Sequence, residues 1–233
     1  MWIEECHADG LRWDAITYIR NIEGRNEDPP DDLPNGWSLM QWINEEIQQR
    51  FPGKITIAEG MHSNAWITKD VGAGGAGFNA QWDNEFVNPV RQAVITRDDA
   101  SRDLRAVSKA IQYHYDLDAF RRVIFTESHD EVANGKTRVP EEIWPGNVDS
   151  WFSKKRSTLA GALVLTSPGI PMIFQGQELL EDHWFQDKAP IDWSRTDDEH
   201  GILGMYREMI GLRRNLSGVT RGLCCLLYTS RCV

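Results

Sequence analysis

Five short apolar segments alternate with longer amphipathic ones, and this alternation is the feature that most constrains the fold. We expect strands at 10–15, 54–59, 78–82, 122–127 and 170–174, and helices at 38–50, 100–113, 153–166 and 200–215. Strands that are separated by helices favour an α/β protein with parallel strands. No dinucleotide-binding fingerprint follows the first strand, which disfavours a Rossmann domain.

The number of strand–helix units indicates part of a barrel. A (β/α)8 barrel needs about 250 residues, and five units with large loops already use most of the 233 residues here. We therefore expect residues 1–222 to form a partial catalytic barrel domain. Residues 1–7 read as the last turns of a helix. Residues 223–233 read as a non-native tail, with a natural disordered tail as the alternative.

Composition excludes several classes of protein. The net charge is −10 and the pI is about 5.1, whereas a nucleic-acid binder normally has a basic surface. No apolar run approaches the roughly 18 residues that a membrane span needs, so we expect no membrane partner. Four cysteines are too few for a disulfide scaffold, which favours the reducing cytoplasm. Ten tryptophans indicate either a carbohydrate site or an aromatic core.

Carboxylates stand at the ends of three expected strands. Asp14 ends the first, Glu59 ends the second, and Asp130 follows the fourth. Barrel enzymes place catalytic groups at the C-terminal ends of their strands, so acid/base and nucleophilic chemistry is expected there. Arg12 lies two residues before Asp14, hence on the same face of the strand, where it would keep that carboxylate ionised.

Two glycine-containing segments could suggest ligand loops. Residues 72–77 hold four glycines, and we expect a mobile loop there rather than a ligand site. The segment Gly135-Lys136-Thr137 lacks the upstream glycine of a phosphate-binding loop, because Asp130 occupies that position.

Three segments together resemble signature regions of one enzyme family. They are Asp9-Gly10-Leu11-Arg12-Trp13-Asp14-Ala15, Ile57-Ala58-Glu59 and Ser128-His129-Asp130, in this order along the chain. They are similar to signature regions of the α-amylase superfamily of glycoside hydrolases and transglycosylases. The resemblance implies that the first strand here is the fourth of the barrel. The fold class expected is therefore α/β, the C-terminal part (strands 4–8) of a (β/α)8 TIM barrel.

The resemblance also assigns roles in a retaining reaction on α-1,4-glucan. Asp14 is the implied nucleophile, Glu59 the general acid/base, and Asp130 the carboxylate that holds the sugar hydroxyls. The further residues expected to contact substrate are Arg12, Trp13, His129 and Glu178. A retaining reaction needs carboxyl groups about 5 Å apart and a protonated acid, for which Glu59 would require burial or nearby negative charge. No cofactor is expected and no metal-ligating residues are predicted; the oligomeric state has no signature in the sequence.

The subfamily follows from a second set of segments. Residues 127–132 with Gly135-Lys136, residues 174–178 and residues 190–193 are similar to the corresponding regions of 1,4-α-glucan branching enzymes. Gly60 and the segment 137–140 depart from that pattern. The alternatives are an α-amylase-type or trehalose-releasing hydrolase, a non-catalytic barrel relative, and a fragment that is inactive and aggregation-prone when expressed alone. All three carboxylates are present, which argues against the non-catalytic relative.

Overall fold

The computed structural model describes residues 1–21, 33–60, 63–133, 135–198 and 200–219. The chain divides into two compact units, which are described separately below. Unit 1 contains Met1–Asn84 and His114–Val123, and unit 2 contains Glu85–Tyr113 and Ile124–Val233. The tail expected at 223–233 lies outside the described residues. No helix in the described part of the chain is long and apolar enough to cross a membrane.

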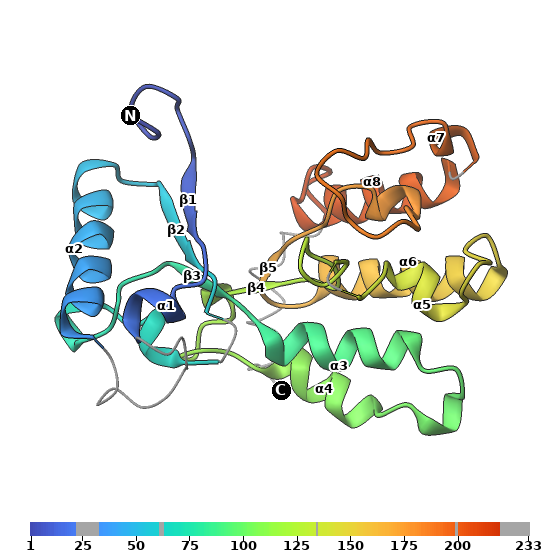
Figure 1. Cartoon of the computed structure of the whole chain (residues 1–233), viewed down its shortest axis with the longest axis horizontal. Coiled ribbons are helices and arrows are strands. Elements are labelled where there is room, and N and C mark those ends of the chain that lie inside the picture. Colours follow the sequence, from blue (N-terminus) through green and yellow to red (C-terminus); the bar gives the residue numbers. More distant parts are fainter. Residues whose placement is uncertain (22–32, 61–62, 134, 199, 220–233) are drawn as a thin grey trace. The chain divides into compact units, whose positions relative to one another are not determined.

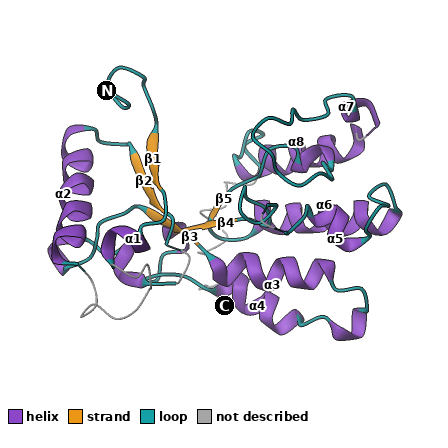
Figure 2. Ribbon diagram, in the orientation of Figure 1, coloured by secondary structure: helices purple, strands orange, loops and turns teal. Residues whose placement is uncertain are grey.

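Strands and helices follow one another as Figures 1 and 2 show. The strands are β1 (Gly10–Trp13), β2 (Ile55–Ala58), β3 (Ala80–Trp82), β4 (Arg122–Ile124) and β5 (Ile170–Pro171). The helices are α1 (Thr17–Arg20), α2 (Pro34–Arg50), α3 (Asn84–Ile95), α4 (Leu104–Gln112), α5 (Val139–Ile143), α6 (Trp151–Thr166), α7 (Arg195–Asp198) and α8 (His200–Arg213). Short 3-10 turns add η2 (Ala65–Ile67), η3 (Val71–Ala73), η4 (Asp99–Ser101), η5 (Ala119–Arg121) and η6 (Gln177–Leu179).

The sheet has the order β1-β2-β3-β4-β5, so neighbouring strands are also consecutive in sequence. The pairs β1–β2, β2–β3 and β3–β4 are parallel. At the last step the Met172 N–H donates to the Ile124 carbonyl at 2.9 Å. Sequential parallel strands joined by helices are the arrangement that the alternation in the sequence predicts. Within the described residues the sheet is open, and β1 and β5 are its edges.

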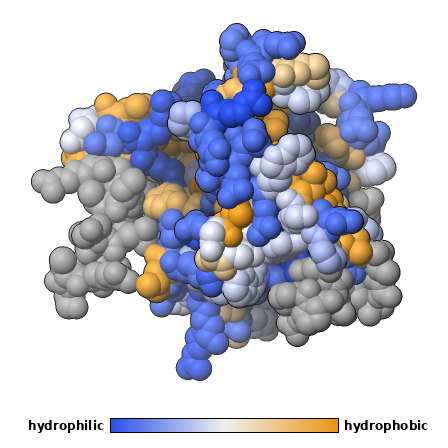
Figure 3. Space-filling view, turned by 90° about the vertical axis from the view of Figure 1, so that its left-hand side faces the viewer, coloured by the Kyte–Doolittle hydropathy of each residue, from blue (hydrophilic) through white to orange (hydrophobic). Residues whose placement is uncertain are grey.

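The core of unit 1 lies between α2 and the strands. Its buried apolar side chains are Ile16, Met40, Ala58, Ile67, Ala76 and Phe78. The helix begins at Pro34, four residues earlier than expected, because proline is well suited to the first turn of a helix. Two large apolar side chains of this helix lie outside the core, since Trp42 is 62% exposed and Leu39 is 42% exposed. Figure 3 views the side on which α2 lies and shows mainly hydrophilic side chains with small hydrophobic patches.

Instead, a polar stripe of α2 holds the glycine-rich segment. Four side chains on one face of the helix, at positions i, i+4, i+7 and i+11, donate to four successive carbonyls. The donor–acceptor pairs are Trp37 Nε1 to Gly74 O (3.1 Å), Gln41 Nε2 to Gly75 O (2.9 Å), Asn44 Nδ2 to Ala76 O (2.7 Å) and Gln48 Nε2 to Gly77 O (3.0 Å). The prediction of a mobile loop at 72–77 is therefore wrong: its backbone is fixed to α2.

We expect Asn44→Ala to lower the free energy of unfolding by about 1–3 kcal/mol, since it leaves the buried Ala76 carbonyl without its donor. The measurement is urea unfolding followed by circular dichroism. Gln49→Ala is the matched control, because Gln49 is exposed on the same helix, and it should stay within about 0.5 kcal/mol of the parent. Equal losses in the two variants would contradict the role given to Asn44.

Unit 2 is built from helices around the ends of β4 and β5. One buried cluster joins Phe86 and Val90 of α3 to Ala110 of α4, with Ile124 and Val164. In Figure 1, α3 and α4 run side by side as a helical hairpin, and α6 lies beside α8. The sequence reading missed α3, because Pro89 lies inside it and proline usually ends a helical pattern.

Tyr206 of α8 is buried against α6. Only 2% of the residue is exposed, and a Cβ added at Gly161 of α6 would lie 2.3 Å from the Tyr206 hydroxyl oxygen. This close approach requires glycine at position 161. Burial raises the pKa of the Tyr206 hydroxyl above its ordinary value, and the negative charges of Glu127 and Glu178 raise it further.

A raised pKa makes stability depend on pH in a defined direction. Below the ordinary pKa of 10.0, Tyr206 makes its full contribution to the free energy of unfolding. As the pH rises above 10.0 this contribution is lost, because the unfolded chain releases the hydroxyl proton while the folded chain keeps it. We expect the difference in unfolding free energy between the parent and Tyr206→Phe to fall by roughly 1.4 kcal/mol per pH unit above pH ~10. Urea unfolding between pH 8 and 11 measures it. Tyr18→Phe, at a residue 71% exposed, should show a constant difference; a constant difference for Tyr206→Phe would refute the prediction.

Several element boundaries differ from those expected. The strand expected at 122–127 ends at Ile124, because the backbone beyond it enters a loop in which Glu127 is buried in an ion pair. Residues 1–7 form turns rather than the end of a helix. The short helix α5 was not expected, because it has only five residues.

Candidate active site

The register between β1 and β2 sets the first part of the candidate site. Trp13 pairs with Ala58, so the next residues, Asp14 and Glu59, stand at the same level beyond the strand ends. Backbone bonds continue the pairing, since the Glu59 N–H donates to the Trp13 carbonyl at 2.9 Å and the Ile16 N–H donates to the Glu59 carbonyl at 3.2 Å. Parallel pairing thus brings two carboxylates from distant parts of the sequence together.

Arg12 contacts both of these carboxylates. Its Nη1 lies 2.5 Å from Asp14 Oδ1 and its Nη2 lies 2.9 Å from Glu59 Oε1. The guanidinium also lies over the Trp82 ring, 4.3 Å from the ring centroid, a distance at which the ring attracts the cation. The environments of the two carboxylates differ: the Asp14 side chain is 77% exposed and the Glu59 side chain only 12%. One is open to a ligand and the other is held within the protein.

The backbone of Ala15 holds the other oxygen of Glu59. Its N–H donates to Glu59 Oε2 at 2.7 Å, so both carboxylate oxygens of Glu59 accept a hydrogen bond. Ala15 has φ = 42°, in the left-handed region that non-glycine residues rarely adopt. The backbone after Glu59 also lies close to this segment, since a Cβ at Gly60 would approach Ile16 Cδ1 at 3.1 Å. Backbone strain of this kind is found preferentially at functional sites.

We expect Ala15→Gly to raise the free energy of unfolding by up to about 1 kcal/mol. Removing the Cβ relieves roughly 1–2 kcal/mol of left-handed strain, and the added freedom of the unfolded chain costs about 0.4–1 kcal/mol. Ala162→Gly, in the middle of α6, is the control and should lose about 1 kcal/mol. Urea unfolding compares the two; a loss at position 15 as large as that at position 162 would rule out stored strain.

Two aromatic side chains near this group differ in what they contact. Trp13 packs edge-on against Phe78, with ring centroids 5.4 Å apart, and joins the core of unit 1. Its expected contact with substrate stays a prediction. Trp82, which sequence reasoning did not select, lies beneath the Arg12 guanidinium. The sequence signal that could have marked Trp82 is its position at the end of an expected strand.

His129 and Asp130 lie together in unit 2. His129 Nε2 is 3.4 Å from Asp130 Oδ2, and the two side chains are 39% and 53% exposed. The turn that carries them is fixed by Ser128, whose Oγ accepts from the Glu131 N–H at 3.2 Å. The His129 ring also lies nearly perpendicular to the Phe185 ring, with centroids 6.5 Å apart. Both groups are therefore placed by fixed neighbours and remain open to a ligand.

A buried ion pair anchors the start of the same loop. Glu127 Oε2 accepts from Arg138 Nη1 at 3.0 Å, with 1% and 3% of the two side chains exposed, and Glu127 Oε1 accepts from the Val139 N–H at 2.7 Å. Such a pair is costly to break, because removing one partner leaves an uncompensated buried charge. This loop contact was not recognised in the sequence, where Glu127 was placed in a strand.

Two further acidic residues near strand ends have contrasting surroundings. Glu178, an expected substrate contact, lies in η6, and its buried Oε2 has no hydrogen-bond partner among the described residues. Asp83 directly follows β3, but it is fully buried and pairs with Arg122 at 3.1 Å. Asp83 is therefore enclosed with its partner and is not available to a ligand.

One group of side chains has ligand types that metals use. Glu181, Asp182 and His183 place one ligand atom each within 4.8 Å of the others. Asp182 already contacts His183 and, at 3.5 Å, the Arg195 guanidinium, while Glu181 accepts from the Asp192 N–H at 3.3 Å. The group is organised as ion pairs and hydrogen bonds, with a guanidinium present beside the carboxylates.

Catalytic groups at the C-terminal ends of parallel strands are a feature of barrel enzymes, and a close pair of carboxylates is the feature of enzymes that act on glycosidic bonds. The sequence model of the alpha amylase catalytic domain matches residues 1–214, and the chain belongs to this family. Its relatives are glycoside hydrolases and transferases of the alpha-amylase type. The expected fold class, the C-terminal part of a (β/α)8 barrel, is confirmed.

Among the relatives are several 1,4-alpha-glucan branching enzymes. The chain is 28% identical to GlgB of Pseudoalteromonas atlantica, with 89% of this chain and 29% of that protein covered. It is 28% identical to GlgB of Cutibacterium acnes (89% and 33% covered) and 30% identical to GlgB 2 of Streptomyces avermitilis (94% and 38% covered). The chain thus spans about a third of the length of these curated relatives.

Solved structures of the same fold include hydrolases. A pullulanase from Paenibacillus barengoltzii has a TM-score of 0.64 at 18% identity, with 91% of this chain and 34% of that chain covered. An alpha-amylase from Anoxybacillus has a TM-score of 0.59 at 15% identity, with 91% and 41% covered. At these identities the likeness concerns the fold alone.

Proposed function

We propose that this chain carries the catalytic carboxylates of a retaining enzyme that acts on α-1,4-glucan and forms α-1,6 branches. Asp14 attacks the anomeric carbon, while Glu59 gives a proton to the departing glucosidic oxygen. Glu59 then takes a proton from a sugar 6-hydroxyl, which displaces Asp14 and restores the α configuration. The single observation that supports this proposal most strongly is the Arg12 guanidinium that Asp14 and Glu59 share.

The shared guanidinium has two consequences for the proposed reaction. It keeps both carboxyl groups close to each other, as the separation of about 5 Å in retaining enzymes requires. It also orients the exposed Asp14 carboxylate, the proposed nucleophile.

Glu59 needs a change of partner before it can serve as the acid. Both of its oxygens accept hydrogen bonds, from Arg12 and from the Ala15 N–H. A proton on either oxygen weakens the contact made there, because the guanidinium and the backbone N–H can only donate and a protonated oxygen is the poorer acceptor. The Arg12 contact is the one that can open, because the guanidinium keeps Asp14 as an alternative partner.

His129 and Asp130 are proposed to hold the hydroxyl groups of the reacting glucose. Asp130 accepts hydrogen bonds from sugar hydroxyls, and His129 donates to the same ring. Their exposure and mutual contact suit this role. Glu178, with a buried oxygen that lacks a partner, is proposed as a further substrate contact.

The choice of acceptor separates branching from hydrolysis. Branching is proposed because several relatives at 28–30% identity are named 1,4-alpha-glucan branching enzymes. Hydrolysis of the same linkage, of the amylase or trehalose-releasing kind, is the alternative. The low cysteine content favours the reducing cytoplasm as the place of the reaction.

The test is product analysis on amylose with the polypeptide that the full reading frame encodes. We expect new α-1,6 linkages, detected by NMR, without a net rise in reducing ends. Asp14→Asn and Glu59→Gln should each lower turnover by roughly 10³-fold or more. For the 233-residue chain expressed alone we expect no turnover.

Asp9→Asn is the matched control. Asp9 lies at the opposite end of β1, is fully exposed and pairs with Lys54 at 3.1 Å, so its loss should leave turnover unchanged. A rise in reducing ends without new branches would favour hydrolysis. Full activity in Asp14→Asn would exclude the proposed nucleophile.

A further inference from the structure

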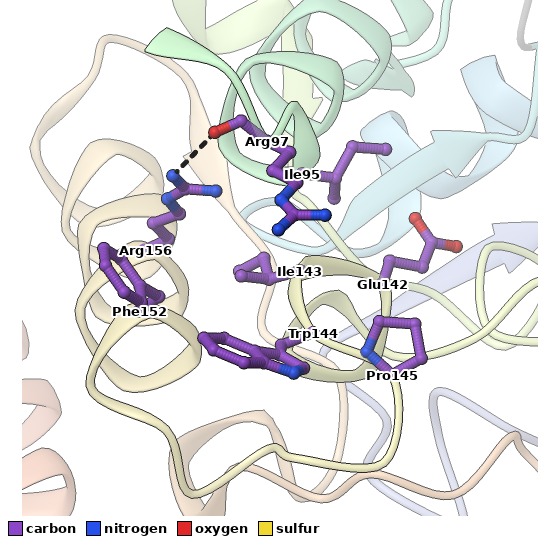
Figure 4. A pocket seen from close by; sticks show the side chains of 8 residues that line it. All are labelled: Ile95, Arg97, Glu142, Ile143, Trp144, Pro145, Phe152 and Arg156. Carbon is purple, nitrogen blue, oxygen red and sulfur yellow. Dashed lines mark hydrogen bonds between the residues drawn. The ribbon is translucent and has the colours of Figure 1, made fainter.

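A hollow in unit 2 is lined by residues outside the candidate carboxylate site. It lies between the end of α3, the residues that end α5, and the first turns of α6, and its volume is about 610 Å³. This volume falls in the range of small-molecule binding sites. Figure 4 shows the side chains that line it: Ile95, Arg97, Glu142, Ile143, Trp144, Pro145, Phe152 and Arg156.

Two aromatic rings form one wall of this hollow. Trp144 is 45% exposed and Phe152 is 46% exposed, and their rings are tilted by 31° with centroids 6.0 Å apart. The indole N–H of Trp144 has no hydrogen-bond partner among the described residues, so it is available as a donor. Ligand pockets are lined mainly by apolar and aromatic side chains together with a few polar groups, which is the composition of this wall.

Charged groups face the same space. The Arg97 guanidinium points into the hollow across from Trp144 (Figure 4) and has no partner in the described part of the chain. Arg156 is held by the carbonyls of Thr96 and Arg97, both at 3.2 Å, and lies 5.6 Å from the Phe152 ring centroid. Glu142 is held by Arg91 at 2.8 Å. The hollow therefore contains two charged groups that are held by other residues, Arg156 and Glu142, and one donor without a fixed partner, Arg97.

This combination selects among ligand classes. A purely apolar ligand would remove charged groups from water without giving them new hydrogen bonds. A cation is disfavoured by the two arginines, and burial together with Arg102 already lowers the pKa of Arg156. A sugar ring has an apolar C–H face that suits an aromatic ring, and a rim of hydroxyls that accept from arginine and donate to a carboxylate.

We propose that the hollow between Trp144, Phe152 and Arg97 binds a segment of neutral α-glucan, independently of the carboxylates Asp14, Glu59 and Asp130. The glucan class of the ligand rests on the proposed function. A polymer chain is longer than the site of cleavage, so a second contact would raise the effective concentration of the bound chain near the reacting carboxylates.

The experiment is calorimetric titration with maltoheptaose of the same polypeptide used for the amylose assay. The double variant Asp14→Asn with Glu59→Gln should keep a binding event, because the hollow contains neither residue. In that background Trp144→Ala should weaken it about tenfold, the scale of one lost stacking contact of about 1.4 kcal/mol. Arg97→Ala, at an exposed residue, should weaken it without affecting the fold.

Trp42→Ala is the matched control, since it removes another exposed tryptophan, 62% exposed against 45% for Trp144, from α2 in unit 1. Circular dichroism verifies that each variant is folded. Binding that is unchanged when Trp144→Ala or Arg97→Ala is made with the carboxylates intact, but is lost in the carboxylate double variant, would overturn the inference while leaving the proposed function intact. Absence of maltoheptaose binding in all forms, or binding of inorganic phosphate or of a protein partner in its place, would also overturn it.

Discussion

The parallel register between β1 and β2 is the constraint on which the candidate site depends. Because Trp13 pairs with Ala58, the residue after each strand is a carboxylate at the same level. A shift by one residue would turn one of them to the other face of the sheet. The backbone bonds of Glu59 to Trp13 and Ile16 extend the pairing past the strand ends and fix this register where the chemistry would take place.

The helix α2 supports this arrangement through polar contacts. Its tryptophan and amide side chains fix four successive carbonyls of the glycine-rich segment, while Met40 and Ala76 bury their apolar surface in the same core. Buried carbonyls outside regular structure need donors, and side-chain amides on a helix supply them in a rigid row. Unit 1 is therefore held on this side by hydrogen bonds that depend on the exact spacing of the helix.

Much of the fold and part of the site could be predicted from local patterns. Runs such as residues 55–58 are short, apolar and β-branched, and strand ends with Asp14 and Glu59 marked the carboxylates. The patterns failed where tertiary contacts override local preference. The helix α3 carries an internal proline, and Glu127 in an apolar run is a buried partner of Arg138. The left-handed backbone at Ala15 has no signal in a single sequence, because the residue there is not glycine.

The unequal exposure of the two carboxylates gives the shared arginine a physical basis for changing partners. In the free protein, water screens the attraction between Arg12 and the 77% exposed Asp14, whereas Glu59, at 12% exposure, is screened less. In the proposed mechanism a glucose ring covers Asp14 and displaces this water, which strengthens the Arg12–Asp14 attraction. The attraction of the guanidinium to Asp14 then exceeds its attraction to Glu59. The Glu59 oxygen that Arg12 leaves can carry the proton that the departing sugar needs. Substrate binding and the readiness of the acid would thus be linked through one side chain.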